Sequence, residues 1–517
     1  MHPFRPLALF CSILLLATPP VAAQLAPLTV PKGLLRLDFG GRFDNWDRRY
    51  LDGERQDAAG DFIRNPLDGG FLPALALDQT ELRRVTGVEA LTLSLGKSSS
   101  SMLVNVGTAN LGAAYGVTRR LTLFGNVPIV RVRVQNRFGL DTTEATAGFN
   151  PSNPVFGNPA LGARTATFLA QFLDALSAIS SNLSGGVYDA DPAKKALAQE
   201  TLARGTTLQG DLEELFAGAT FLPLDGSAAA GALLTPIEAI RTTIASLGVA
   251  GFTESPALPS ARVGDAAFED YVTRPEGPIA GLPFQVPILQ YLGDVEIGAA
   301  YAWLDHRPAR GLGIRSVLQG TVRLRTGKLD RPDDFFDLGT GEGQPDLQGD
   351  LVTDLAAGGF GARLSARYVY QFPGRQARRL SPPDQPIAFA ALTADVERDP
   401  GEIMEVGVEP YLRIAPTLAL LGGIRRWSKS ADTYRYAQSQ APIDGTSPEV
   451  LALGSKANGT VVSLGLSLAH DGRRKDGTTG LPMDASLRWE KVVGSTLGRV
   501  AAKESVVAGI RFYRRLF

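Results

Sequence analysis

Residues 290–326 read QYLGDVEIGAAYAWLD, HRPARGLG and IRSVLQGTVRLRT in succession, and this stretch predicts the fold of the chain. In its first part, Ile297, Tyr301 and Trp303 share one parity, while small or charged residues hold the other. In its last part, Leu318 and Val322 alternate with arginines and polar residues in the same way. Because side chains alternate between the two faces of a strand, each part is a strand with one apolar and one polar face.

The Gly-, Pro- and Arg-rich connection between these parts predicts an antiparallel hairpin. Strands of roughly ten or more residues are long for a soluble sheet, where about five to six residues are usual. An apolar face toward lipid and a polar face toward a lumen are typical of a transmembrane β-barrel. The hairpin therefore predicts an all-β, antiparallel outer-membrane β-barrel.

The composition excludes other classes of protein. The net charge of the 517 residues is −1, so the chain lacks the basic field of a nucleic-acid-binding protein. The mature sequence has no run of about eighteen apolar residues, which excludes a helical membrane protein but not a barrel. The counts of 57 glycines and 34 prolines fit many turns better than a helical bundle.

Residues 1–23 have the pattern of a secretory signal peptide. His2 and Arg5 precede an apolar run over 7–17, and Val21-Ala22-Ala23 resembles a small-residue cleavage site. The only cysteine, Cys11, lies inside this segment, so we expect no disulfide, thiol chemistry or cysteine-bound metal in the mature protein. The mature barrel would then occupy residues 24–517, in the outer membrane.

The same alternation recurs along the chain and predicts about twelve strands, an even number, as bacterial barrels require. Short turns would lie on the periplasmic side and long connections on the extracellular side. The terminal Phe517 resembles the assembly signal of outer-membrane barrels, which predicts contact with the barrel-assembly machinery during biogenesis. The expected strands cover about 33–43, 104–116, 121–138, 291–305, 314–325, 351–357, 361–372, 403–414, 418–436, 460–469, 483–490 and 504–517.

In the expected strand at 121–138, the apolar residues change from odd to even positions midway. Leu121 and Leu123 have odd numbers, whereas Val132 and Val134 have even ones, and Pro128 lies between the two pairs. Since a bulge shifts register by one residue and proline cannot donate to a ladder, we expect a bulge at this proline. The arginines at 131 and 133 would then point into the lumen.

Residues 139–287 break the strand pattern and predict a helical extracellular insertion. Phe168, Phe172, Leu176 and Ile179 recur at helical spacing and form an apolar stripe. Further helices would open at Asp191-Pro192 and at Thr235-Pro236. The stripes either bury one another in a small helical subdomain or line a receiving site above the barrel mouth.

Charged residues with the inward parity are the candidate lumen lining. They either pair and close a narrow barrel, or leave an arginine surplus that favours anions. The candidates are Arg36, Arg42, Arg131, Arg133, Arg315, Arg323, Arg325, Arg363, Arg367, Glu405, Glu409, Arg413, Arg488, Glu490 and Arg511.

Three segments resemble the outer-membrane transporters of the meta-pathway phenol-degradation type, which are FadL-like transporters of hydrophobic compounds. The first is YGVTRRL over 115–121, followed by Val127-Pro128, and the second is LGDVEIGAAY over 292–301. The third is Arg325-Thr-Gly327 with GTGEG over 339–343 and Asp346 downstream. The resemblance covers roughly 104–138 and 290–517 and implies a barrel that transports small hydrophobic molecules.

Catalytic machinery is not visible in the sequence. Of the three histidines, His2 leaves with the signal peptide, and His306 and His470 fall in expected periplasmic turns, away from any suitable serine. The acidic stretch 328–350 is either a solvated loop or a weak divalent-cation site, without regular ligand spacing. We expect no enzyme activity, no cofactor and no metal.

The sequence therefore predicts a passive outer-membrane transporter for small hydrophobic or amphipathic molecules. Its expected partners are membrane lipid and a small-molecule solute, and no nucleic acid. One alternative is a channel for small anions through an arginine-lined lumen. Another is a barrel with a structural or surface-interaction role that transports nothing.

Overall fold

The computed structural model describes residues 28–275, 277–278, 288–308, 311–332, 334, 336–381, 385, 392–470 and 481–515. The expected signal peptide and Phe517 lie outside these residues, and so do 279–287 of the insertion and most of the turn at 470–482. Within the described part, no helix is long and apolar enough to cross a membrane.

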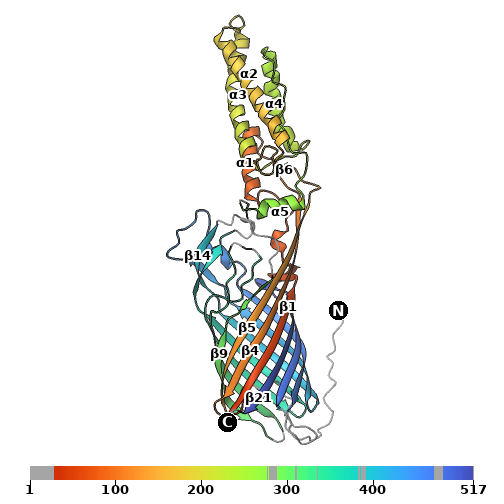
Figure 1. Cartoon of the computed structure of the whole chain (residues 1–517), viewed down its shortest axis with the longest axis vertical. Helices are drawn as coiled ribbons and strands as arrows, with labels where there is room; N and C mark the ends of the chain where they lie inside the picture. The colour runs from red at the N-terminus through yellow and green to blue at the C-terminus, as the bar shows by residue number, and fades with distance from the viewer. Residues whose placement is uncertain are drawn as a thin grey trace, which may run out of the picture.

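Twelve antiparallel strands form a closed barrel, as the sequence predicted (Figure 1). Each strand pairs with its neighbours in chain order, and β1 closes the ring by pairing with both β4 and β21. The strands are β1 (Leu34–Trp46), β4 (Lys97–Gly116), β5 (Leu121–Asp141), β9 (Glu296–His306), β10 (Gly313–Arg323), β11 (Asp346–Ala357), β12 (Phe360–Gln371), β15 (Ile403–Ala415), β16 (Leu418–Lys429), β18 (Ala457–His470), β19 (Met483–Gly494) and β21 (Glu504–Arg515).

The alternation of residues assigns the two faces of this wall. Large apolar side chains such as Phe39, Trp303 and Leu464 are exposed on the outside. The alternate positions hold the charged side chains that pair with one another across the inside. The outer face is therefore the lipid-facing belt that a transmembrane barrel needs.

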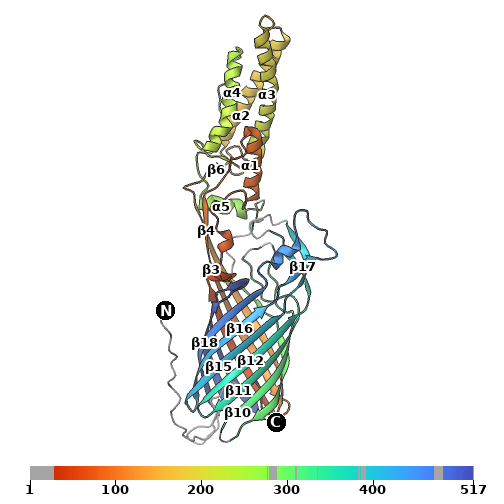
Figure 2. The same ribbon diagram turned by 180° about the vertical axis from the view of Figure 1, so that it is seen from behind.

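The connections differ strongly between the two ends of the barrel. Short turns follow β4, β9, β11 and β15 at one end, which we call the short-turn end. Long connections follow β1, β5, β10, β12 and β16 at the other, the long-loop end (Figure 2). Three small sheets lie at this end, formed by these connections and by the one after β19. They are β2 (Arg48–Leu51), β3 (Glu54–Asp57) and β20 (Arg499–Ala501); β13 (Gly374–Arg379), β14 (Thr393–Asp399) and β17 (Thr433–Tyr436); β6 (Ala147–Phe149) and β7 (Phe221–Pro223).

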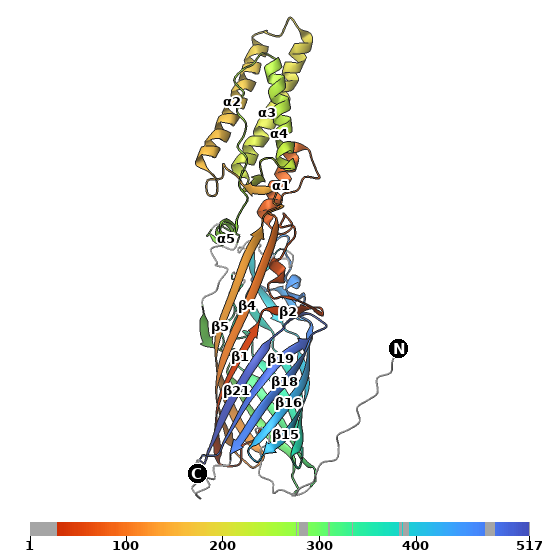
Figure 3. The same ribbon diagram turned by 90° about the vertical axis from the view of Figure 1, so that its right-hand side faces the viewer.

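Strands β4 and β5 are longer than predicted and rise above the other strands (Figure 3). They carry a bundle of long helices that stands beyond the long-loop end (Figures 1 and 3). The helices are α1 (Pro73–Thr86), α2 (Pro159–Ser184), α3 (Pro192–Gly218), α4 (Ala228–Ser246) and α5 (Asp265–Thr273), with short 3₁₀ turns at Gly60–Phe62 and Pro448–Ala452.

Local sequence explains where the helices begin. Asn158 and Asp191 each accept hydrogen bonds from backbone N–H groups of the first turn of α2 and α3, and a proline follows at the first helical position. The start of the third helix was predicted wrongly. Ser227 caps α4, and Pro236 lies inside it, because the apolar face of the helix packs into the core along its whole length.

The connection between β1 and β4 contributes a further helix. Its apolar stretch FLPALAL, over 71–77, contains the start of α1, which packs against α3, α4 and β7. The stretch LTLSLG, over 91–96, follows α1 and forms an isolated bridge between Ser94 and Asp68. Two connections that are far apart in sequence therefore build one helical bundle.

The bulge expected at Pro128 is not in β5. That strand keeps one register with β4 from Thr122 to Asp141. The irregularity lies in its other partner, where β8 (Leu289–Leu292) and β9 pair with β5 in registers that differ by one residue. Between them, the Gly293 N–H donates to the Pro128 carbonyl at 2.9 Å. Since proline has no N–H, the partner strand absorbs the mismatch.

Candidate functional site

The inward face of the barrel is lined by arginines and carboxylates that pair with each other. Arg363 lies 2.6 Å from Asp354, and Arg367 lies 2.7 Å from Asp350, in each case across neighbouring strands. The further wall pairs are Arg36–Asp38 at 2.7 Å, Arg323–Asp346 at 3.1 Å, Arg323–Glu296 at 3.3 Å, Arg511–Asp484 at 3.4 Å and Arg511–Asp38 at 3.6 Å.

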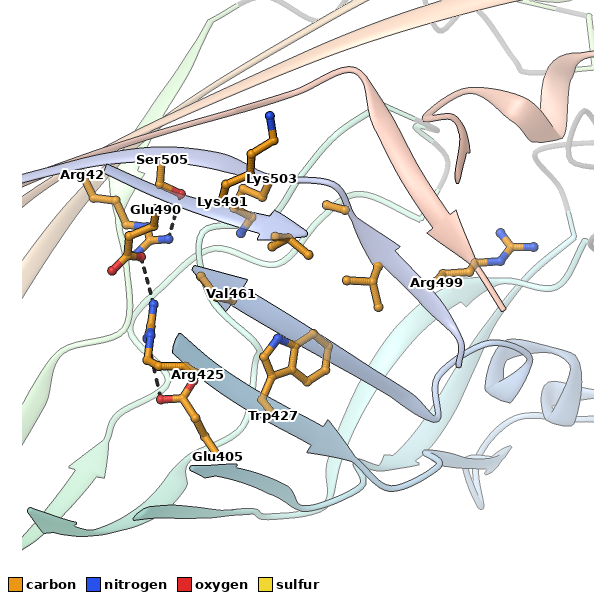
Figure 4. Close-up of a pocket in the computed structure, with 13 residues that line it drawn as sticks. Arg42, Glu405, Arg425, Trp427, Val461, Glu490, Lys491, Arg499, Lys503 and Ser505 are labelled. Atoms are coloured by element: carbon orange, nitrogen blue, oxygen red, sulfur yellow. Dashed lines mark hydrogen bonds and ion pairs between the residues drawn. The ribbon is translucent and has the colours of Figure 1, made fainter. Parts of the chain in front are cut away.

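Glu490 is the most connected of these carboxylates and is almost completely buried (Figure 4). Its oxygens lie 3.2 Å from Arg42, 3.0 Å from Arg425 and 3.7 Å from Arg488. Arg488 on β19 also lies 2.7 Å from Glu409 on β15, and this ion pair spans the two strands between them. This network ties one side of the lumen together.

A cavity of about 350 Å³ lies beside this network (Figure 4). Trp427 and Val461 form part of its wall, together with the ion-paired Arg425 and Glu405. A second lumen cavity, of about 460 Å³, lies between the inner faces of β1, β4, β5 and β21. Open space thus remains inside the barrel although its charges are paired.

The sequence missed much of the acidic half of this lining. The candidates predicted from the sequence suggested an arginine surplus, but carboxylates on β1, β9, β11 and β19 match the arginines. One further arginine, Arg425 on β16, also belongs to the lining. The added residues are Asp44, Glu296, Asp346, Asp350, Asp354, Asp484 and Arg425. Their parity relative to the outward leucines was the signal that could have found them. Strand β11 shows it, because Leu347 and Leu351 are exposed while Asp346 and Asp350 are buried.

Three candidates need correction. Arg131 and Arg133 are exposed on the outer face of β5, with the parity of the exposed Leu123 and Val127. The cause is the missing bulge, since without it the parity stays unchanged beyond Pro128. Arg325 lies beyond the end of β10 and is exposed.

Two further candidates lie inside. Arg315 lies 3.7 Å from Asp305 and donates to Thr29 of the N-terminal segment. Arg413 is half-buried on the inward parity of β15, and its Nε is buried without a hydrogen-bond partner among the described residues.

The apolar stripe of α2 does not line an open receiving site. Phe168, Phe172 and Ile179 are fully buried and Leu176 is nearly so, all in the main hydrophobic core. Phe172 stacks on Phe252 with ring centroids 4.8 Å apart. The helices bury these side chains against one another, which was the other interpretation of the pattern.

An apolar cavity of about 200 Å³ lies at the long-loop end, where the barrel meets its connections. Two arginines, Arg49 and Arg499, lie at its wall, and Arg49 pairs with Asp61 at 2.7 Å. Its apolar lining comes from β1, β4, β5, β20 and the connections between β1 and β4 and between β10 and β11. It consists of Trp46, Ala58, Met102, Val104, Val134, Phe336, Leu338, Val500 and Ala501.

The connection 324–345 brings two of these side chains to the cavity. Phe336 is buried there and packs on Phe62 with ring centroids 5.6 Å apart. Leu338 remains partly exposed at the cavity wall. This connection therefore crosses part of the barrel mouth.

Asp294 holds the base of that connection. Its carboxylate accepts the Gly327 N–H at 2.8 Å and the Glu342 N–H at 3.0 Å. The Thr326 hydroxyl donates to the Gly293 carbonyl, and the Thr340 hydroxyl donates to the Leu292 carbonyl. These residues belong to the second and third segments that carried the family resemblance, so the structure gives both segments one architectural role.

Asp78 on α1 is the buried carboxyl of the helical bundle. It accepts the backbone N–H groups of Thr220 and Phe221 at 3.1 and 2.7 Å. Burial raises the pKa of Asp78 to about 7, although both hydrogen bonds favour the ionised form. Burial and the nearby Asp78 charge also raise the pKa of Tyr271.

No protein-family model matches the chain, and no curated protein sequence matches it. Several solved outer-membrane barrels are similar in structure. The COG4313 outer membrane channel from Pseudomonas putida F1 has 9% identity and a TM-score of 0.41, with 95% of this chain and 99% of that chain covered. A TodX monoaromatic hydrocarbon channel mutant has 10% identity and a TM-score of 0.29, covering 94% and 91%. A Pseudomonas aeruginosa FadL homologue has 9% identity and a TM-score of 0.27, covering 94% and 91%.

Likenesses this distant transfer no solute to this chain. The barrel fold rests on the strand pairings of the chain itself.

Proposed function

We propose that this protein is a passive outer-membrane transporter for small hydrophobic or amphipathic molecules. The apolar cavity at the barrel mouth is the observation that carries the proposal. Concave, mostly apolar cavities with a few polar groups are the usual form of small-molecule sites. Burial of apolar surface provides roughly 25 cal/mol per Å², so a small aromatic solute would gain several kcal/mol there.

The proposal places the long-loop end outside the cell, because short periplasmic turns and long extracellular loops are the rule in such barrels. A solute would enter from that side and pass the 324–345 connection into the lumen. The helical bundle would stand above the entrance, with its own core closed.

A channel for small anions is less well supported by the lining. The lumen arginines are matched by carboxylates on facing strands, so the field at the wall has no strong sign. Charge selectivity of a channel depends on rings of side chains with the same charge, whereas this lumen has pairs of opposite charge. A barrel that transports nothing would leave the apolar mouth cavity without a role.

The test uses a new charge at the cavity wall. Leu338→Arg places a guanidinium at the partly exposed wall of the mouth cavity. Leu453→Arg makes the same change at an exposed leucine elsewhere on the long-loop end. Both proteins would be reconstituted in vesicles and supplied with the uncharged fluorescent probe N-phenyl-1-naphthylamine.

We expect Leu338→Arg to slow probe entry at least tenfold and Leu453→Arg to leave it unchanged. Single-channel currents of the same preparations provide the second measurement. Steady anion-selective current with no acceleration of probe entry would refute hydrophobic transport and favour the anion channel. If neither current nor probe entry exceeds that of empty vesicles, the protein is no transporter.

A further inference from the structure

The arginines on the outer face of β5 begin where the lipid-facing belt ends. The outward positions Leu121, Leu123, Val127 and Ile129 are apolar. The next outward positions are Arg131 and Arg133, both exposed. Arginine on the lipid face costs about 2–4 kcal/mol at the bilayer midplane and about 0–1 kcal/mol near the interface. The switch from apolar to basic residues therefore marks the edge of the hydrocarbon.

The cross-strand neighbours of these two arginines are uncharged. In the part of the chain that the structure describes, no carboxylate forms an ion pair with Arg131 or Arg133. Their cross-strand partners on β4 are Gly107 and Asn105, and Gln290 on β8 faces Arg131. This differs from the lumen, where arginines lie beside carboxylates.

A further cation, Lys328 of the connection after β10, lies on the other face of the wall and does not join this pair. Lys328 is exposed, and its ammonium lies 3.2 Å from the hydroxyl of Tyr291 and 4.3 Å from the centre of its ring. Tyr291 pairs with Val130, and because successive residues of a strand point to opposite faces, its side chain lies on the face opposite Arg131. We call Arg131 and Arg133 the basic rim.

The height of the basic rim fits the headgroup layer. A strand rises about 3.3 Å per residue, so Arg131 lies roughly 7 Å and Arg133 roughly 13 Å beyond Ile129 along β5. With a strand tilt of about 40°, these distances become roughly 5 and 10 Å along the membrane normal. The polar layer on each side of the hydrocarbon is about 5–8 Å thick. Both guanidinium groups can reach it.

We propose that the basic rim binds phosphate-bearing headgroups of the surrounding lipid leaflet at the long-loop end. Guanidinium groups bind phosphate oxygens through paired, charge-assisted hydrogen bonds, and both arginines of the basic rim are exposed on the same face of β5. The proposal depends on the transmembrane barrel and not on the transported solute, so it can fail or succeed independently of hydrophobic transport.

The test compares two double variants with the same loss of charge. Arg131→Gln with Arg133→Gln removes both cations of the basic rim. Arg137→Gln with Arg204→Gln is the control, because Arg137 is exposed on the same face of β5 beyond the headgroup layer and Arg204 is an exposed residue of α3. All four side chains are exposed, so both variants should fold, which heat-dependent gel mobility would check.

Detergent-purified full-length proteins would be titrated with bisphosphorylated lipid A and with its dephosphorylated form, and bound lipid counted by native mass spectrometry. Each basic residue near an anionic surface contributes about 1 kcal/mol, so we expect roughly 30-fold weaker binding of the phosphorylated lipid by the rim variant. The control variant should bind within about twofold of the unchanged protein.

Equal binding of both lipids would overturn the proposal, and so would an equal loss in the two variants. The last measurement is a competition between the lipid and inorganic phosphate. If millimolar inorganic phosphate displaces the lipid completely, the rim is a site for free phosphate and the lipid proposal is wrong.

Discussion

Replacing Glu490 by glutamine tests whether the lumen network is an electrostatic unit. The change removes one buried carboxylate charge that three arginines share, at distances of 3.0, 3.2 and 3.7 Å. At an effective dielectric constant of about 20, each attraction is about 5 kcal/mol before desolvation is subtracted. Removing one partner of a buried ion pair costs about 3–5 kcal/mol in measured cases.

The lower end of that range is the better expectation here. The Arg42 and Arg425 side chains are about one third exposed to the lumen, so water screens part of their charge. We therefore expect Glu490→Gln to lower the free energy of unfolding by about 3 kcal/mol, measured by urea titration in lipid vesicles. Glu504→Gln on the neighbouring strand is the control, because Glu504 is exposed on the outer face and should change stability by about 0.5 kcal/mol or less.

A compensating variant separates charge from shape. Glu490→Gln with Arg42→Gln removes one charge of each sign, and we expect it to recover about 1 kcal/mol relative to Glu490→Gln alone. Glu490→Gln should also admit anions more readily, since Arg425 and Arg488 lose a shared counter-charge. If Glu490→Gln unfolds like the unchanged protein, the arginines do not depend on this carboxylate and the reasoning fails.

Two further predictions concern the helical bundle and the 324–345 connection. Burial raises the pKa of Asp78 to about 7 from an ordinary 3.8. Between pH 3.8 and pH 7, the folded bundle therefore keeps a proton on Asp78 that the unfolded chain has released. Bundle stability should therefore fall as pH rises from about 4 to 7, by up to about 4 kcal/mol, and Asp78→Asn should flatten this dependence in urea titrations followed by helical circular dichroism. Asp174→Asn, an exposed change on α2, should keep the slope, and an unchanged slope in Asp78→Asn would contradict the assignment. Gly341→Ala should loosen the connection, because its Cβ would lie 2.5 Å from the Asp294 Oδ1 and 2.7 Å from the Gly327 Cα. We expect tryptic cleavage near Lys328 to accelerate at least tenfold in Gly341→Ala, whereas Gly210→Ala on α3, which meets nothing within 4 Å, should cleave like the unchanged protein.

The alternation of residues predicted the barrel because it depends on local geometry alone. Strand register follows parity wherever one face meets lipid. The parity of Ile297, Tyr301 and Leu318 was therefore sufficient to predict which face of the β9–β10 hairpin is the apolar one. Parity failed at Pro128, where the irregularity lies in the partner strand and not in β5. Which of two strands absorbs a defect is a property of the pair, and one strand's sequence does not contain it.

The candidate site was harder to predict for a similar reason. The inward arginines were visible as charges of one parity, but their partners come from strands far away in sequence, such as Arg42 and Glu490. The mouth cavity joins side chains from β1, β4, β5, β20 and the 324–345 connection. Burial of Phe168 and Phe172 likewise depends on α3, α4 and the segment around Phe252. A helical stripe predicts that a face is covered, and the covering partner follows only from the fold.

The closed core of the helical bundle also limits where a solute can be recognised. Its apolar stripe faces inward, so binding there would require the helices to separate and expose several large aromatic side chains. Truncating one such side chain costs about 3–5 kcal/mol, which indicates how unfavourable that exposure would be. The mouth cavity needs no such rearrangement, because Leu338 already lies partly exposed at its wall. Under the proposed function, recognition at the barrel mouth therefore requires less rearrangement than recognition inside the bundle.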